Sequence, residues 1–281
     1  MNKTNRRDFI KLSGLGLAAA AFSVNSCLSE EAKAPGLSQE ALNLGMASYT
    51  FREFSLEQAI SMTKRLGLSR ISLKSFHLPL DSSENEIKKA AALVKDAGLN
   101  LYGVGVIYMK NEQEVERAFQ YAHTAGAQVI IGVPDPDLLG LVEEKVKQLD
   151  IRLAIHNHGP TDKLYPTPES AYERIKELDQ RIGLCLDAGH TQRAGKDPAA
   201  SALQCKDRLL DVHIKDVTQA AAAGTTCEIG RGVINIPRLI KTLIKIDYRD
   251  CAALEFEKDG NDPLPGAAES IGFLKGVLEV I

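Results

Sequence analysis

The stretch Ile182–His190, with the sequence IGLCLDAGH, joins an apolar run to polar side chains at its end. An uninterrupted apolar run is typical of a parallel strand that is covered on both faces. Asp187 and His190 follow this run directly. Burial of such groups is costly unless they are paired or bind a metal. The stretch therefore predicts a parallel α/β fold whose strand ends carry the chemistry.

Three other apolar runs of the chain end in the same way. Each is followed at once by histidine, lysine or carboxylate side chains. Because the ends of neighbouring parallel strands lie close together, we expect these side chains to share one region. The runs are Ile151–His158, which delivers His156 and His158, Leu209–Asp216, which delivers His213, Lys215 and Asp216, and Cys251–Glu257, which delivers Glu255 and Glu257.

Strand and helix patterns alternate from residue 42 to the C-terminus. Helix starts are marked by the capping sequence Ser55-Leu56-Glu57-Gln58 and by Thr167-Pro168. Eight strands, each followed by a helix, predict a single (β/α)8 TIM barrel. A doubly wound open sheet is the alternative, but no glycine-rich nucleotide-binding sequence follows any strand. The expected strands span 44–51, 70–76, 99–108, 127–133, 151–157, 182–187, 209–215 and 251–257.

The charge balance bears on the class of partner. The chain carries a net charge of −3, and its first 27 residues hold four basic side chains against one acidic side chain. The remainder is therefore clearly acidic. Binding to a nucleic-acid backbone needs a basic face. We expect no nucleic-acid partner, and a small molecule as the substrate.

The N-terminus resembles a bacterial export leader. Asn5–Lys11, with the sequence NRRDFIK, is similar to the twin-arginine motif, and an apolar stretch over 12–22 follows it. That stretch is too short for a transmembrane helix and suits a signal peptide. Val24–Cys27 resembles a lipobox, although Asn25 is not the usual small residue.

These features predict three segments in the chain. Residues 1–27 form a twin-arginine or lipoprotein-type signal, residues 28–41 a linker, and residues 42–281 the barrel. The expected location is the periplasm or a membrane, with attachment through a lipidated Cys27.

The last four expected strands each end in one metal-ligating side chain. His156, Asp187, His213 and Glu255 follow strands five, six, seven and eight. Active sites of TIM barrels lie at the C-terminal ends of the strands, so these four side chains can converge there. Two imidazoles and two carboxylates suit a divalent transition metal, namely Mn, Zn, Co or Fe, better than Mg.

The sequences LDAGH, VHIKD and ALEFE at the last three strands resemble the xylose-isomerase-like TIM barrel superfamily, in its sugar phosphate isomerase/epimerase branch. The resemblance extends over residues 42–281. It implies a metal-dependent enzyme that acts on a sugar, with Asp187, His213 and Glu255 as metal ligands. It also implies contact of His190 with the substrate or the metal.

One position departs from the pattern of the epimerases in this family. They carry a glutamate at the end of strand five, in a sequence like ENH, whereas this chain has His156-Asn157-His158. In those epimerases two glutamates exchange protons at one carbon of the sugar. With His156 in place of one of them, the two-base mechanism is in doubt, although histidine can also act as ligand or base.

The expected chemistry is proton abstraction beside a sugar carbonyl, through an enediolate. Glu255 or His156 is expected to take the proton, while Lys215 and His190 stabilise the developing negative charge. Further side chains near strand ends are candidates for substrate binding. They are His158, Arg231, Lys74, His77 and Glu257.

Three reactions share this intermediate. Protonation at another carbon gives an isomerase, protonation on the opposite face gives an epimerase, and loss of a leaving group gives a lyase. Exported relatives in glycan-degrading bacteria include enzymes that cleave 3-keto-glycosides by elimination and hydration. The isomerase or epimerase is the first expectation, and the 3-keto-glycoside lyase is the alternative. A sugar-binding protein without activity is a third, while the acidic charge argues against an endonuclease.

Overall fold

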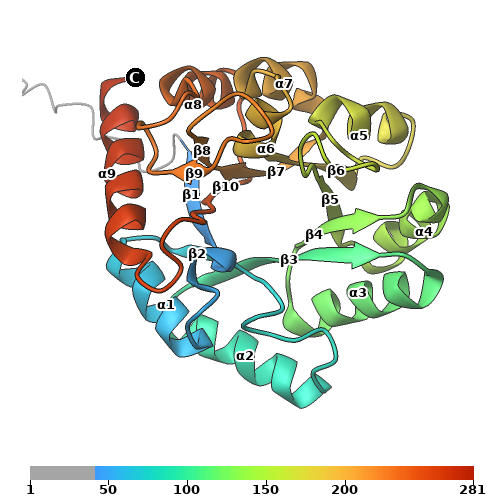
Figure 1. Cartoon of the computed structure of the whole chain (residues 1–281). Coiled ribbons are helices and arrows are strands. Elements are labelled where there is room, and N and C mark those ends of the chain that lie inside the picture. Colours follow the sequence, from blue (N-terminus) through green and yellow to red (C-terminus); the bar gives the residue numbers. More distant parts are fainter. Residues whose placement is uncertain (1–41) are drawn as a thin grey trace, which may run out of the picture. The chain divides into compact units, whose positions relative to one another are not determined.

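A computed structural model describes residues 42–281. Within them, eight parallel strands close into a barrel in the order β1-β10-β7-β6-β5-β4-β3-β2, which confirms the predicted TIM barrel (Figure 1). The barrel strands are β1 (Asn43–Ala47), β2 (Arg70–Leu73), β3 (Asn100–Met109), β4 (Val129–Pro134), β5 (Arg152–His156), β6 (Ile182–Asp187), β7 (Leu209–Ile214) and β10 (Cys251–Leu254).

Helices surround the barrel on its outside (Figure 1). Ser55 and Ser83 form capping boxes with Gln58 and Glu86, so the serine and the side chain three residues on each satisfy a free backbone N–H. The helices are α1 (Leu56–Arg65), α2 (Glu84–Asp96), α3 (Glu112–Ala125), α4 (Leu139–Leu149), α5 (Pro168–Ile175), α6 (Ala188–Arg193), α7 (Pro198–Gln204), α8 (Ile236–Lys245) and α9 (Leu264–Val280), with 3-10 turns η1 (Ser48–Phe51), η2 (Pro136–Leu138) and η3 (Lys206–Arg208).

The first and last barrel strands are shorter than the sequence predicted. Residues 48–51 form the turn η1 instead of continuing β1. The last strand ends at Leu254, and Phe256 N then donates a hydrogen bond to Thr50 Oγ1 at 3.0 Å instead of to the sheet. Glu255 and Glu257 therefore lie just beyond the strand, at the mouth of the barrel.

A short hairpin after β7 was not expected from the sequence. It pairs β8 (Asp216–Val217) with β9 (Thr226–Cys227) in antiparallel fashion. The Asp216 carboxylate accepts hydrogen bonds from Gly230 N, Gly232 N and Ile234 N, at 2.9 to 3.1 Å. Asp216 thus fixes the loop that follows the hairpin.

The strand register sets two levels of side chains inside the barrel. His156 pairs with Cys185, and Cys185 pairs with Asp211. Asp187 pairs with His213 one level further towards the C-terminal mouth. Side chains two residues apart on a strand point to the same side, so Cys185 lies below Asp187.

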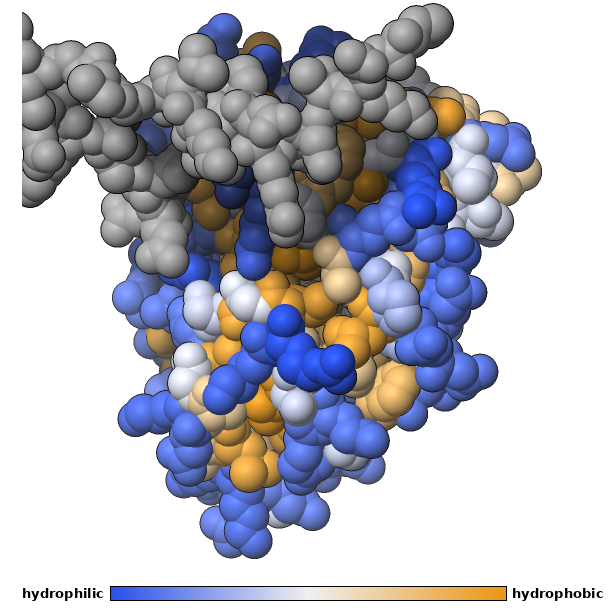
Figure 2. Space-filling model, turned by 90° about the vertical axis from the view of Figure 1, so that its left-hand side faces the viewer, coloured by the Kyte–Doolittle hydropathy of each residue, from blue (hydrophilic) through white to orange (hydrophobic). Residues whose placement is uncertain are grey.

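The expected signal (1–27) and linker (28–41) lie outside the described residues. No helix within residues 42–281 is long and apolar enough to cross a membrane. On the face shown in Figure 2, hydrophilic side chains surround a smaller hydrophobic area. Apolar atoms form a large part of any protein surface, so this area identifies no partner by itself.

Candidate active site

The four side chains expected to bind a metal meet at the C-terminal mouth of the barrel. One ligand atom from each of them lies within 4.8 Å of the ligand atoms of the other three. All four residues are at most 4% exposed. The polar ends of β5, β6, β7 and β10 therefore form one buried cluster, which consists of His156, Asp187, His213 and Glu255.

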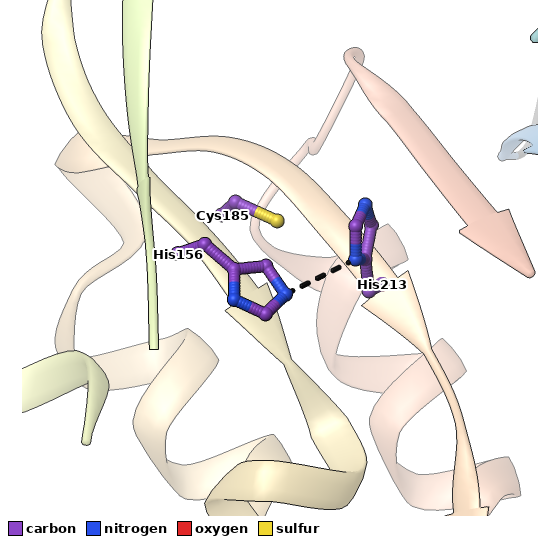
Figure 3. Close-up of side chains that lie close together, drawn as sticks. All are labelled: His156, Cys185 and His213. Atoms are coloured by element: carbon purple, nitrogen blue, oxygen red, sulfur yellow. Dashed lines mark hydrogen bonds between the residues drawn. The ribbon is translucent and has the colours of Figure 1, made fainter. Parts of the chain in front are cut away.

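The two imidazoles of the cluster face each other. His156 Nε2 lies 3.2 Å from His213 Nδ1 (Figure 3). His156 Nε2 also lies 3.6 Å from Asp187 Oδ2, and His213 Nδ1 lies 3.4 Å from Glu255 Oε2. Both rings thus direct one nitrogen towards the carboxylates.

The two oxygens of Asp187 have different surroundings. Oδ1 accepts a hydrogen bond from His190 N at 2.6 Å and caps the N-terminus of α6. The Asp187 backbone N–H donates to Asn157 Oδ1 at 3.0 Å. Oδ2 has no hydrogen-bond partner in the described structure and points into the cluster. The residue is therefore held firmly, and its Oδ2 faces the other side chains of the cluster and the Lys215 ammonium.

This donor set fits a divalent metal. The cluster offers two imidazole nitrogens and two carboxylates, which are the usual ligands of transition metals in proteins. With the adjacent Glu257 and Asp211, its four carboxylates are balanced by one buried ammonium group, that of Lys215. A divalent cation would offset most of the negative charge that remains.

Lys215 holds the carboxylates of the site together. Its Nζ donates to Glu255 Oε2 at 2.8 Å and to Glu257 Oε1 at 2.5 Å, and it lies 3.1 Å from Asp187 Oδ2. Its stem passes over Gly189, where an added Cβ would lie 2.7 Å from Lys215 Cδ. The glycine of LDAGH is thus the residue that leaves room for the lysine.

Lys215 also sets the charge states of its neighbours. Burial alone would raise the pKa of Asp187 and of Glu255, but the Lys215 ammonium and the neighbouring imidazoles together outweigh burial and hold both pKa values well below their usual range. Burial alone would lower the pKa of Lys215, but the three carboxylates raise it well above its ordinary value. Both carboxylates are therefore ionised and Lys215 is charged at neutral pH.

The histidines of the cluster differ in their protonation. Burial lowers the pKa of His156 well below its ordinary value, so this imidazole is neutral. Burial would also lower the pKa of His213, but Glu255, together with Asp211 and Asp187, raises it overall. The other nitrogen of His213, Nε2, lies 3.4 Å from Asp211 Oδ2. An acidic group behind a histidine fixes which ring nitrogen faces a metal.

His158 and His190 form a second layer beside His156. The His158 and His156 ring centroids lie 4.4 Å apart, and those of His158 and His190 lie 5.6 Å apart. His158 Nε2 lies 3.1 Å from the Tyr108 hydroxyl, and the two rings stack. Burial, helped by His190, lowers the pKa of His158 to about 4. His158, His190 and Tyr108 are thus uncharged hydrogen-bonding side chains at the C-terminal mouth of the barrel.

Two of the expected substrate-binding residues lie at the cluster. Glu257 contacts Lys215, as described above, and its side chain is 34% exposed. The Lys74 ammonium lies 4.7 Å from the centre of the Tyr49 ring. Burial lowers the pKa of Lys74, and the charges of Glu255, Lys215 and Glu257 also act on it. Glu257 thus lies beside the cluster, and Lys74 lies within range of its charges.

The structure does not bring His77 and Arg231 to the cluster. His77 Nδ1 lies 3.0 Å from Ser48 Oγ, and its Nε2 lies 3.0 Å from the Phe51 carbonyl oxygen, so both ring nitrogens are engaged. Arg231 forms a two-pronged ion pair with Glu269 of α9, and its side chain is 63% exposed. Their contacts are those of structural residues.

Sequence reasoning missed Tyr108 and Asp211. Tyr108 lies near the end of β3, and this position was the only signal for a site role. Asp211 precedes His213 by two residues and is fully buried. A carboxylate two residues before a ligand on one strand must share its side of the barrel, and this alternation could have identified it.

Comparisons with known proteins agree with this architecture. A family model described as "Xylose isomerase-like TIM barrel" matches residues 60–277. The rhizopine catabolism protein MocC of Rhizobium meliloti is 28% identical over 137 residues, which cover 43% of this chain and 42% of that protein. The match thus spans less than half of the length of that relative.

Two solved structures share the fold. A D-tagatose 3-epimerase-like protein has a TM-score of 0.70 at 19% identity, over 85% of this chain and 98% of that chain. The 3-keto-D-glucoside 4-epimerase YcjR of E. coli has a TM-score of 0.68 at 16% identity, over 84% of this chain and 99% of that chain. With the family model matched over most of its length, the chain belongs to the xylose isomerase-like TIM barrel family.

Proposed function

We propose that the protein is a metal-dependent sugar isomerase or epimerase that abstracts a proton beside a sugar carbonyl. The observation that carries the proposal is the convergence of His156, Asp187, His213 and Glu255 within 4.8 Å at the mouth of the barrel. A binding protein without activity has little use for a buried set of ligands with a charged lysine beside it. The sugar epimerases that share the fold support this class of reaction.

The four clustered residues would hold the metal. When bound there, it would polarise a sugar carbonyl and a neighbouring hydroxyl and so acidify the adjacent carbon. Lys74, His158 and Tyr108 border the cluster and would orient the sugar through their polar groups. The donor set favours Mn, Zn, Co or Fe over Mg as the bound metal.

Glu255 is the best candidate for the base. Its low pKa keeps the carboxylate ionised at neutral pH, and Lys215 holds one of its oxygens at 2.8 Å. The Lys215 ammonium would also stabilise negative charge that develops on an oxygen of the substrate. His190 and the neutral His156 lie beside this point and supply further polar contacts.

Elimination from a 3-keto-glycoside is the second candidate. Glu255 and Glu257 both contact Lys215, whereas neutral His156, His158 and Tyr108 occupy the side of β5 and β3. A two-base epimerisation needs a second base on the opposite face of the sugar. Position 156, where the epimerases carry a glutamate, holds a histidine in this chain. Removal of one proton and departure of the aglycone need only one such base.

We also propose that the protein acts after export. The support is the sequence of residues 1–27, with its twin-arginine-like motif, its apolar stretch and Cys27. The location would be periplasmic or at a membrane, through a lipidated Cys27. Labelling of cells with a radioactive fatty acid, for the native chain and Cys27→Ser, would test the lipid attachment.

The function is tested by isotope exchange. The purified protein is assayed for bound metal and is incubated in deuterium oxide with a free ketose and with a 3-keto-glucoside. Deuterium uptake with the carbon skeleton retained supports the isomerase or epimerase, and release of the aglycone supports the lyase. Absence of both metal and exchange would exclude both and favour the binding protein.

A further inference from the structure

We propose that Cys185 is an additional, inner metal ligand, so that the site offers a sulfur donor together with His156 and His213. The inference rests on the proposed metal-dependent function, which does not itself assign a role to this thiol. Ligand atoms of His156, Cys185 and His213 all lie within 4.8 Å of one another. Figure 3 shows Cys185 beside both imidazoles, with its sulfur pointing towards His213.

The strand register places Cys185 at this point. It pairs directly with His156 across β5 and β6, and it precedes Asp187 by two residues on the same strand. Cys185 and Asp187 therefore both face the barrel interior, one level apart. His156 lies on the level of Cys185 and His213 on the level of Asp187, so the two imidazoles span both levels. They can serve an outer position, with Asp187 and Glu255, or an inner position, with Cys185.

The surroundings of Cys185 differ from those of a thiol that merely fills an apolar core. Its Sγ donates a hydrogen bond to Asp211 Oδ2 at 3.1 Å. The thiol also lies beside the imidazoles of His156 and His213. Two imidazoles, a thiol and a nearby carboxylate are a set of donors that suits a metal.

Formation of the bond is balanced within these residues. The Cys185 S–H bond breaks, its proton passes to the Asp211 carboxylate that already accepts the hydrogen bond, and the sulfur electron pair forms the bond to the divalent cation. No oxidant or reductant is needed. The thiolate is the form that binds metals, and Asp211 supplies the acceptor that its formation requires.

A sulfur ligand would change the choice of metal. Thiolate and imidazole favour Zn²⁺ or Co²⁺, whereas carboxylate oxygens favour Mn²⁺ and Mg²⁺. A sulfur ligand added to the four clustered residues would therefore favour Zn²⁺ or Co²⁺ over Mn²⁺ at this site.

Cobalt(II) absorption tests the inference. The native protein is stripped of metal and titrated with Co²⁺, and the near-ultraviolet band from thiolate to cobalt is recorded with the stoichiometry of bound metal. We expect one Co²⁺ per chain and a thiolate band in the native protein and in Cys205→Ser. Cys205 is a matched control, since it is fully buried and lies outside the barrel wall, after α7. We expect Cys185→Ser to bind Co²⁺ without the band.

Each other result overturns the inference. Stoichiometric Co²⁺ without the band excludes Cys185 as a ligand and leaves the proposed function intact. A band that persists in Cys185→Ser assigns the sulfur to another residue, and absence of bound Co²⁺ refutes both proposals. If Cys185→Ser does not fold, X-ray absorption of the Zn²⁺-loaded native protein decides, because a Zn–S distance of about 2.3 Å is diagnostic.

Discussion

Lys215 Nζ lies 2.8 Å from Glu255 Oε2 at the point where β7 and β10 end side by side. The lysine side chain is 2% exposed and the glutamate side chain 5% exposed. Two neighbouring strands thus deliver a buried ion pair whose charges depend on each other. The same ammonium group contacts Asp187 and Glu257, so it is the common partner of three carboxylates.

We expect Lys215→Met to destabilise the metal-free protein. The change leaves Asp187 and Glu255 buried without their cation, and the loss of one partner of a buried ion pair costs about 3 kcal/mol or more. Urea denaturation of the metal-free protein measures the free energy of unfolding. Saturating divalent metal should recover part of the loss, because a bound cation replaces the missing positive charge.

Lys258→Met is the control for this change. Lys258 pairs with Glu228 at 2.7 Å, but its side chain is 43% exposed. Exposed pairs contribute little, because water solvates both partners. An equal decrease in the free energy of unfolding for Lys215→Met and Lys258→Met would contradict the importance assigned to the buried ammonium.

We expect Glu255→Gln to lower the rate of deuterium exchange by roughly 1,000-fold, the order of magnitude that a positioned base contributes. The amide keeps the size of the side chain but cannot take a proton. Glu257→Gln is the matched variant, since it also removes one carboxylate charge beside Lys215. Its exchange rate should fall by less than about tenfold, as for a residue that only positions the lysine. A larger fall in the exchange rate for Glu257→Gln than for Glu255→Gln would make Glu257 the base.

We expect divalent metal to stabilise the protein. A ligand that binds only the folded state at 100 times its dissociation constant raises the free energy of unfolding by about 2.7 kcal/mol. Removal of metal by a chelator should lower the melting temperature correspondingly. Asp187→Asn should weaken the metal response and still cap α6 through its amide oxygen. An unchanged metal response in Asp187→Asn would exclude Asp187 as a ligand.

We expect His77 to contribute to the pH dependence of stability. Burial lowers its pKa below the ordinary value of 6.5, although its hydrogen bond to the Phe51 carbonyl opposes this. Below about pH 6.5 the unfolded chain therefore binds a proton that the folded protein does not. The contribution of neutral His77 to the stability of the folded protein is therefore fully present above about pH 6.5 and is lost as the pH falls below it.

His77→Gln should accordingly make the free energy of unfolding less dependent on pH below about pH 6.5. The amide can still donate to the Phe51 carbonyl and accept from Ser48, so the local contacts survive. His123→Gln, at an exposed position on α3, is the control and should leave the dependence unchanged. Urea denaturation at a series of pH values provides the measurement.

The barrel and the metal cluster could be predicted because both follow from local patterns. Capping sequences mark helix starts, and the polar ends of four apolar runs must meet once the parallel strands close. Asp187, His213 and Glu255 lie where the sequence placed them. In a closed barrel, the order of strands along the chain determines which strand ends are neighbours.

Contacts between loops could not be predicted in the same way. Arg231 lies in a glycine-flanked loop after β7, but its direction depends on Glu269, 38 residues further along the chain. His77 directly follows a predicted strand, yet Ser48 and Phe51 of another loop occupy both of its nitrogens. Proximity to a strand end restricts where a side chain begins, and tertiary contacts decide where it points.

Arg231→Gln and Lys74→Met test this distinction. Arg231 is held by Glu269, so its replacement should leave kcat and KM within about twofold of the native values. Lys74 lies beside Tyr49 and within the field of Glu255 and Glu257, where its ammonium can bind a substrate oxygen. Loss of one charged hydrogen bond should raise KM by roughly tenfold. Steady-state kinetics of both variants measure these effects. A large rise in KM for Arg231→Gln alone would mean that the loop after β7 turns towards the substrate during the reaction.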